Sequence, residues 1–195
     1  MSDNQFPPIG SAAFKPTKLL ITKLEAARRQ LATAIGLWFH NGDPVSIHAL
    51  AYAAHEILHV ISRRRGDAGL LYTNAAIKEE HRKEFNVFIK KHANWIKHAK
   101  DDWDSTLDFN PTAGLSFIMV SLWGVIKLGE ELNDAESTLL AWACLHQPTW
   151  FKDHIVKNTL PDDLATQLRS LNRREFYEAI AILRGQARQP ARPQN

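Results

Sequence analysis

The sequence predicts an all-α fold: a helical bundle of four long helices, followed by three or four shorter C-terminal helices. Apolar residues recur at helical spacing, no segment alternates with period two, and helix start and stop signals bound the segments. The 195 residues, 45% hydrophobic and 23% charged, suit one folded domain. We expect residues 16–185 to form it. Residues 1–15 and 186–195 should be disordered, because both ends are rich in proline and polar residues.

The composition narrows the function classes. The single cysteine, Cys144, excludes an intrachain disulfide and a thiolate metal cluster, which fits a reducing compartment. The first ten residues lack the basic and apolar regions of a secretory signal, and the most apolar stretch, 115–128, is too short to span a bilayer. We therefore expect a cytoplasmic protein without a membrane partner.

Two helices should form an antiparallel hairpin at the start of the domain. The first is expected from about Thr17 to His40, with Asn41-Gly42 ending it. The second follows at once, with Asp43 as its N-cap, Pro44 at the first helical position and Gly66 at its end. The apolar stripe of the first helix consists of Leu20, Leu24, Ala27, Leu31, Ala34, Ile35 and Trp38.

The second helix carries a stripe of histidines opposite its apolar side. At 100° per residue, His48, Tyr52, His55 and His59 fall within about 60° of one another, and Glu56 flanks them. We expect these histidines to lie outside the core, facing solvent or a cleft that another element covers.

A third helix is expected from about Ala75 to Lys100. Its buried face should hold Ile77, Phe85, Phe88, Ile89, Trp95 and Ile96, together with His81 and His92 as hydrogen-bonded core histidines. Its outer side should hold Lys83, Lys90, Lys91, Asn94, Lys97 and His98.

One more long helix and several shorter ones are expected after the third helix. The stretch from Pro111 to about Glu131 is apolar on nearly every side, which predicts a helix at the centre of the bundle with Trp123 buried. Asn133 and Glu136 have the spacing of a capping box before a helix from Asp134 to His146. Further helices should cover 150–158, begin at Pro161, and cover 173–184.

Charge is unevenly distributed behind the net value of +3. Residues 61–100 hold ten Lys or Arg against four Asp or Glu, whereas residues 101–136 hold one lysine against eight acids. The two segments could be solvated helix faces that pair with each other. Alternatively, the basic segment could bind phosphates or RNA beside an acidic rim.

The second helix contains His55-Glu56-Ile57-Leu58-His59, the H-E-x-x-H pattern of zinc hydrolases. Histidines four residues apart can both reach one zinc ion, and the glutamate between them could act as the base on metal-bound water. A third ligand is missing from any recognised position, although Glu79 and Glu80 lie at a workable distance in sequence. The alternative is a solvated histidine face.

The segment Ala93-Asn94-Trp95-Ile96-Lys97-His98 resembles the motif of HEPN domains, the all-helical bundles of bacterial toxins and phage-defence proteins. In that family an arginine and a histidine about five residues later cleave RNA as a dimer and without metal. Asn94 and His98 match the motif, whereas Ala93 stands in place of the arginine and Lys91 is the nearest cation. The segments IHALAYAAHEILH, NWIKHAKDD and LDFNP also resemble a set of uncharacterised small bacterial all-α proteins, which implies no activity.

Three functional hypotheses follow. The first is a HEPN-like module that binds RNA or a nucleotide as a homodimer, needs no cofactor, and has weak or no catalysis. In it His98 would be the catalytic residue, and the phosphate contacts would come from Lys91, Asn94, Lys97, His98, Arg63 and Arg64. The second is a zinc-dependent hydrolase with His55 and His59 as ligands and Glu56 as the base. The third is a non-catalytic protein-interaction module.

Overall fold

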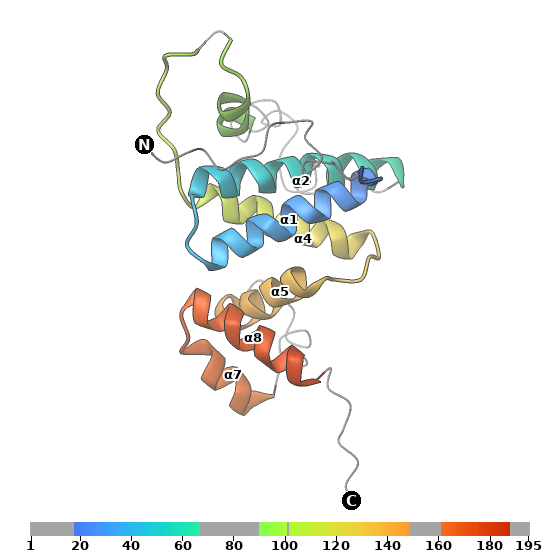
Figure 1. The fold of residues 1–195 in the computed structure, drawn as a ribbon, viewed down its shortest axis with the longest axis vertical. Coiled ribbons are helices and arrows are strands. Elements are labelled where there is room, and N and C mark those ends of the chain that lie inside the picture. The colour runs from blue at the N-terminus through green and yellow to red at the C-terminus, as the bar shows by residue number, and fades with distance from the viewer. Residues whose placement is uncertain (1–17, 67–89, 101, 149–160, 188–195) are drawn as a thin grey trace, which may run out of the picture.

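The computed structural model describes residues 18–66, 90–100, 102–148 and 161–187, and every regular element in these ranges is a helix. The all-α fold is therefore confirmed (Figure 1). Residues 90–97 are helical too, and we call this stretch helix 90–97. The other elements are α1 (Lys23–Phe39), α2 (Pro44–Arg64), α4 (Ala113–Lys127), α5 (Asp134–His146), α7 (Asp162–Arg169) and α8 (Arg173–Ala187).

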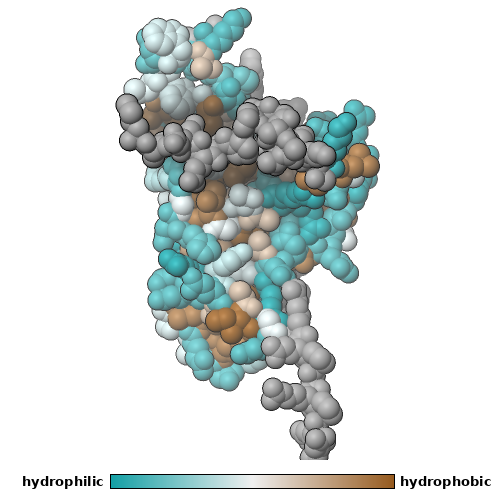
Figure 2. Space-filling view, viewed as in Figure 1, coloured by the Kyte–Doolittle hydropathy of each residue, from teal (hydrophilic) through white to brown (hydrophobic). Residues whose placement is uncertain are grey.

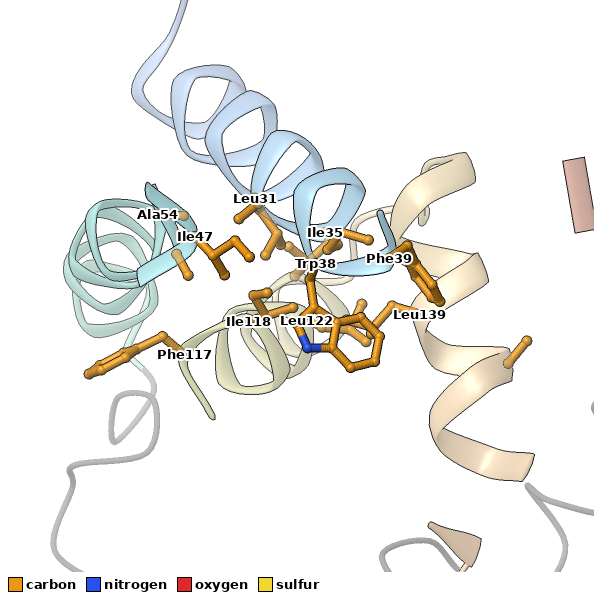
Figure 3. Close-up of a cluster of buried hydrophobic side chains, with 14 of the residues drawn as sticks. Leu31, Ile35, Trp38, Phe39, Ile47, Ala54, Phe117, Ile118, Leu122 and Leu139 are labelled. Atoms are coloured by element: carbon orange, nitrogen blue, oxygen red, sulfur yellow. The ribbon is translucent and has the colours of Figure 1, made fainter. Parts of the chain in front are cut away.

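Helices α1, α2 and α4 pack against one another and form the main core. The loop 40–43 joins α1 to α2, and the two run antiparallel side by side, as predicted (Figure 1). Helix α5 packs on α1, and α7 and α8 lie beyond it at the end of the molecule that is lowest in Figure 1. The core joins Leu31, Ile35 and Phe39 of α1 to Ile118 and Leu122 of α4 and Leu139 of α5 (Figure 3).

Helix caps account for most of the element boundaries. Asp43 accepts a hydrogen bond from the Ser46 N–H at 2.7 Å, and Gly66 has a φ of +89°, as expected for the two ends of α2. The predicted capping box of Asn133 and Glu136 opens α5, whose bounds match the prediction. A further capping box, Thr22 with Glu25, starts α1 at Lys23 rather than near Thr17. Leu20 therefore lies outside the helix and is fully exposed, which corrects its place in the apolar stripe.

Helix α4 is buried on one side and not all round. It covers 113–127 and not 111–131, because Asn110 and Pro111 form a turn before it and Gly129, with a φ of +73°, follows its end. Its buried face holds Gly114, Phe117, Ser121 and Val125, among others. The side chain of Trp123 is 48% exposed, so the prediction that it is buried was wrong. Most of the other large apolar residues of α4 are buried or packed against the core, so Trp123 marks the side of the helix that faces outward.

Several predicted features lie outside the described residues: the chain up to residue 17, the third helix before Lys90 with His81, and the helix at 150–158. The predicted tail from residue 186 begins inside α8, which continues to Ala187 past Gly185. In the described part of the chain, no helix combines the length and apolarity that crossing a membrane requires.

One buried ion pair joins α1 to the start of α5. The carboxylate of Glu136 is fully buried and accepts two hydrogen bonds from Arg28, at 3.1 Å from Nε and 2.6 Å from Nη2. It also accepts the N–H of Asn133 at 2.8 Å, so the same side chain caps α5. Because the pair is shielded from water on the Glu136 side, removing one partner leaves a charge that water cannot solvate.

Replacing Arg28 with alanine should therefore lower the free energy of unfolding by about 3 kcal/mol, because the Glu136 carboxylate stays buried without its cation. Urea denaturation at pH 7.5 measures the change. Arg174→Ala is the matched control, since Arg174 pairs with Glu178 at 2.9 Å on the exposed face of α8 and its loss should leave stability nearly unchanged. Equal effects of the two substitutions would show that the Arg28 pair is solvated.

Candidate functional site

The histidine stripe of α2 does not face solvent: other elements cover it, which was the second of the two expected alternatives. It is buried in the core, however, and the expectation that it lies outside the core was wrong. His48 and His55 are fully buried, Tyr52 is 2% exposed, and His59 is half-buried. Among the described residues, this side of α2 is covered by the start of α4 with Phe117 and by helix 90–97 with the segment that contains Phe109. Periodicity placed these residues on one side of α2, and a second set of aromatic rings packs against that side.

Helix α4 can cover the stripe because its backbone approaches α2 closely at Gly114. A Cβ atom at Gly114 would lie 2.8 Å from Cγ2 of Ile47 and 3.3 Å from the backbone nitrogen of His48, so a larger residue would force α2 or the Ile47 side chain to shift. One turn later, Phe117 points away from Ile118 and Leu122 of the same helix and lies on the α2 side of the core (Figure 3). Its ring centre is 5.2 Å from that of His48 and 5.1 Å from that of Tyr52.

His48 sits in a box of rings. Its ring centre lies 5.2 Å from Phe117, 5.6 Å from Phe109, 5.7 Å from His92 and 6.4 Å from Tyr52. Among the described residues, neither ring nitrogen of His48 has a hydrogen-bond partner. Burial lowers the pKa of His48 to about 4, and the charge of His92 contributes to the shift. The imidazole is therefore neutral at pH 7.

The next turn of the stripe is neutral as well. Burial, with smaller contributions from His59 and Lys90, lowers the pKa of His55 to about 3. The pKa of His59 is also lowered, first by burial. Tyr52 has a raised pKa because it is buried and because it faces the Glu56 carboxylate, to which it is hydrogen-bonded. These rings are thus packing groups that carry no charge at neutral pH.

The H-E-x-x-H residues have only part of a zinc site. The ring centres of His55 and His59 are 5.8 Å apart, near the separation of about 5 Å that two imidazoles bound to one tetrahedral zinc would have. Glu56, the expected base, is hydrogen-bonded to Tyr52. No group of three possible ligands occurs in the described ranges, and Glu79 and Glu80 lie outside them. The described residues therefore supply two of the three or four ligands that a zinc site needs.

Helix 90–97 separates its residues into an inner and an outer side. Ala93 is 1% exposed and packs into the core, whereas Lys91, Asn94 and His98 are exposed. The N–H of His98 donates to the carbonyl of Asn94 at 3.0 Å and so continues the last turn. At 100° per residue, Lys91, Asn94, Trp95 and His98 form one stripe, which we call the outward stripe. Trp95 belongs to it and is 37% exposed, so its predicted burial was wrong.

Lys97 lies at the edge between helix 90–97 and α2. Its ammonium nitrogen is 4.5 Å from the centre of the Tyr52 ring, a cation–π contact, while the residue as a whole is exposed. Ion pairs within the described ranges join Arg28 to Glu136, Arg65 to Glu130 and Arg174 to Glu178. In these ranges, no lysine between 90 and 100 is neutralised by a carboxylate.

The two arginines predicted to extend the basic surface lie further along α2. Arg63 and Arg64 are exposed in its last turn, as predicted. Arg64 is twelve residues beyond Tyr52, or about 18 Å along the helix axis at 1.5 Å per residue. The structure therefore brings Lys97 to Tyr52 but leaves the arginines several turns away, so a ligand would have to be extended to reach both groups.

Sequence reasoning missed the aromatic groups next to this surface. The indole N–H of Trp95 donates to the hydroxyl of Ser105 at 2.7 Å, and Trp103, in the same segment as Ser105, is 77% exposed. The contact joins a helix to a loop ten residues later, which helical periodicity does not reveal. The sequence signal that could have indicated these groups is the presence of two tryptophans, Trp95 and Trp103, close to the lysines of helix 90–97.

No family model matches the chain, and no match was found among curated proteins or solved structures.

The buried histidines should make the protein sensitive to acid. Their pKa values are lower in the folded chain than the 6.5 of an exposed histidine, so the unfolded chain binds protons that the folded chain excludes. The resulting stability is complete above pH 6.5 and falls as the pH drops toward 4. Between pH 8 and pH 5, His48 should account for a loss of about 1–2 kcal/mol in the free energy of unfolding.

Urea denaturation of wild type and His48→Gln at pH 8 and at pH 5 measures the contribution of His48 to this loss of stability. The glutamine variant should have a lower free energy of unfolding than wild type at pH 8. Between pH 8 and pH 5, however, that free energy should fall less in the variant than in wild type. His98→Gln is the control, because the exposed His98 should contribute little. An equal acid loss in wild type and the His48 variant would contradict the neutral, buried state of His48.

Proposed function

We propose that the chain is a HEPN-like helical module that binds RNA or a nucleotide through the outward stripe, with weak or no cleavage. The observation that supports this most is the exposure of Lys91, Asn94 and His98 side by side on one helix, with Lys97 at its edge. Phosphate oxygens accept hydrogen bonds from groups of this kind: lysine ammonium groups, and the N–H groups of amides and imidazoles. A role in bacterial toxin or phage-defence systems, with a second copy as partner, belongs to the same proposal.

The buried Ala93 favours binding over catalysis. In the family that the motif resembles, an arginine at this position acts together with the histidine. Here the position is 1% exposed and faces the core, so no cation can act from it. His98 remains exposed and could still move a proton, but the charge that would stabilise a cleaving transition state has no counterpart at residue 93.

Lys97 can take part in binding even though it contacts Tyr52. The aromatic ring restrains the lysine side chain without neutralising it, so the ammonium group keeps its charge for a phosphate. Lys91 lies on the open side of the helix. Together they offer two phosphate contacts on adjacent faces of helix 90–97.

RNA binding should therefore weaken steeply with salt, and the lysines should account for part of that dependence. On a single strand, each phosphate contact adds about −0.7 to the slope of log affinity against log salt concentration. Lys91→Ala with Lys97→Ala should flatten the slope by about 0.7–1.4 units. Fluorescence anisotropy of a labelled 12-nucleotide RNA at several salt concentrations measures it.

The control is the double variant Arg169→Ala and Arg174→Ala, which removes the same charge from exposed positions on α7 and α8 at the opposite end of the molecule (Figure 1). It should keep the wild-type slope. If both double variants flatten the slope equally, the attraction comes from net charge and not from the outward stripe. No binding by wild type at 50 mM salt would reject the proposal.

A zinc-dependent hydrolase is the second candidate, and the spacing of the His55 and His59 rings is the observation that favours it. Both imidazoles are neutral at pH 7 and so could donate to a metal. The metal content of the purified protein before and after chelation separates the two candidates. About one zinc ion per chain, lost together with thermal stability, would favour the hydrolase.

A further inference from the structure

The outward stripe contains one tryptophan, Trp95, and a turn that Trp95 contacts carries a second, Trp103. Residues 102–105 form this turn, closed by the Ser105 N–H, which donates to the Asp102 carbonyl at 2.9 Å. Trp103 is its second residue and is 77% exposed. An isolated exposed tryptophan is ordinary. This one is set apart by the second indole, Trp95, which contacts the same turn through Ser105.

The hydrogen bond to Ser105 determines which part of Trp95 remains available. Indole has one polar group, its N–H, and that group is already engaged at 2.7 Å. Trp95 as a whole is 37% exposed, and what its side chain can still offer a ligand is apolar ring surface. The same bond holds the turn against the helix, so the Trp103 ring is attached to a braced loop and not to a loose one.

Charge is arranged so that phosphates and bases would contact different parts of this surface. Lys91 lies one turn before Trp95 on the same stripe, and His98 lies one turn after it. Asp102 and Asp104 flank Trp103, and their charges would repel a phosphate at the turn. The phosphates of a bound strand are thus directed to the helix, while an uncharged base can lie on Trp103. This end of the molecule is uppermost in Figures 1 and 2, and it is mainly hydrophilic in colour.

We infer that Trp95 and Trp103 form a stacking platform for the bases of single-stranded RNA whose phosphates contact the outward stripe. This inference rests on the proposed function and adds that the bound RNA is single-stranded and is held through its bases as well as its phosphates. Every base has an apolar face that stacks on an aromatic ring, largely regardless of its identity. In a duplex those faces are covered by neighbouring bases, so a duplex cannot use the platform.

The test compares three labelled ligands by anisotropy in 100 mM salt: a 12-nucleotide oligoadenylate, a 12-base-pair RNA duplex, and inorganic polyphosphate of similar charge. The single strand should bind at least about tenfold more tightly than the other two. Trp103→Ala should weaken single-strand binding about 5- to 100-fold. It should leave the salt slope unchanged, because no phosphate contact is lost. Trp103→Phe should restore most of the affinity, since it keeps a ring.

Trp123→Ala is the matched control, because Trp123 is also exposed, on α4, and lies outside this surface. It should bind like wild type, and circular dichroism should show that all variants fold. The stacking proposal is wrong if Trp103→Ala keeps full affinity for the single strand, or if polyphosphate and the duplex bind as tightly as the single strand. The phosphate-binding proposal would survive that result if the lysine variants still flatten the slope. Failure of wild type to bind any of the three ligands would overturn both.

Discussion

The structure depends on the burial of α2 on two sides. One side, with Ala54 and Leu58, belongs to the main apolar core. The other side carries His48, Tyr52 and His55, which are as fully buried although their side chains are polar. Burying a charged imidazole costs free energy, and the cost is avoided where the ring stays neutral and is closely packed. Phe109, Phe117 and His92 supply that packing.

This burial also positions the candidate site. Helix 90–97 directs His92 toward His48 of α2 and buries Ala93 in the core. Because a helix has fixed angular spacing, Lys91, Asn94, Trp95 and His98 then point outward. The orientation of the exposed groups thus follows from the packing of buried ones. Tyr52 connects the interior with the surface, since it contacts Phe117 in the interior and the Lys97 ammonium group at the surface.

Local signals predicted the elements well, because caps act within a few residues. Asp43, Gly66, Asn133 and Glu136 gave boundaries that the structure confirms. The side on which a helix is covered depends on partners far along the chain, and there the predictions failed. Trp123 lies on an apolar helix but faces outward, and the histidine stripe looks polar but faces inward. The sequence could identify Lys91, Asn94 and His98 as exposed, whereas the role of Ser105 in bracing Trp95 required the tertiary structure.

The central claim is the orientation of helix 90–97, with Ala93 inside and Asn94 outside. Thiol labelling of single cysteine variants tests it most directly, because the native Cys144 is 1% exposed and should react slowly. In native buffer, Asn94→Cys should react with a thiol reagent at least about tenfold faster than Ala93→Cys, because reaction requires an accessible thiolate. In urea the two should react alike. Equal rates in native buffer, or a faster reaction at position 93, would contradict the account.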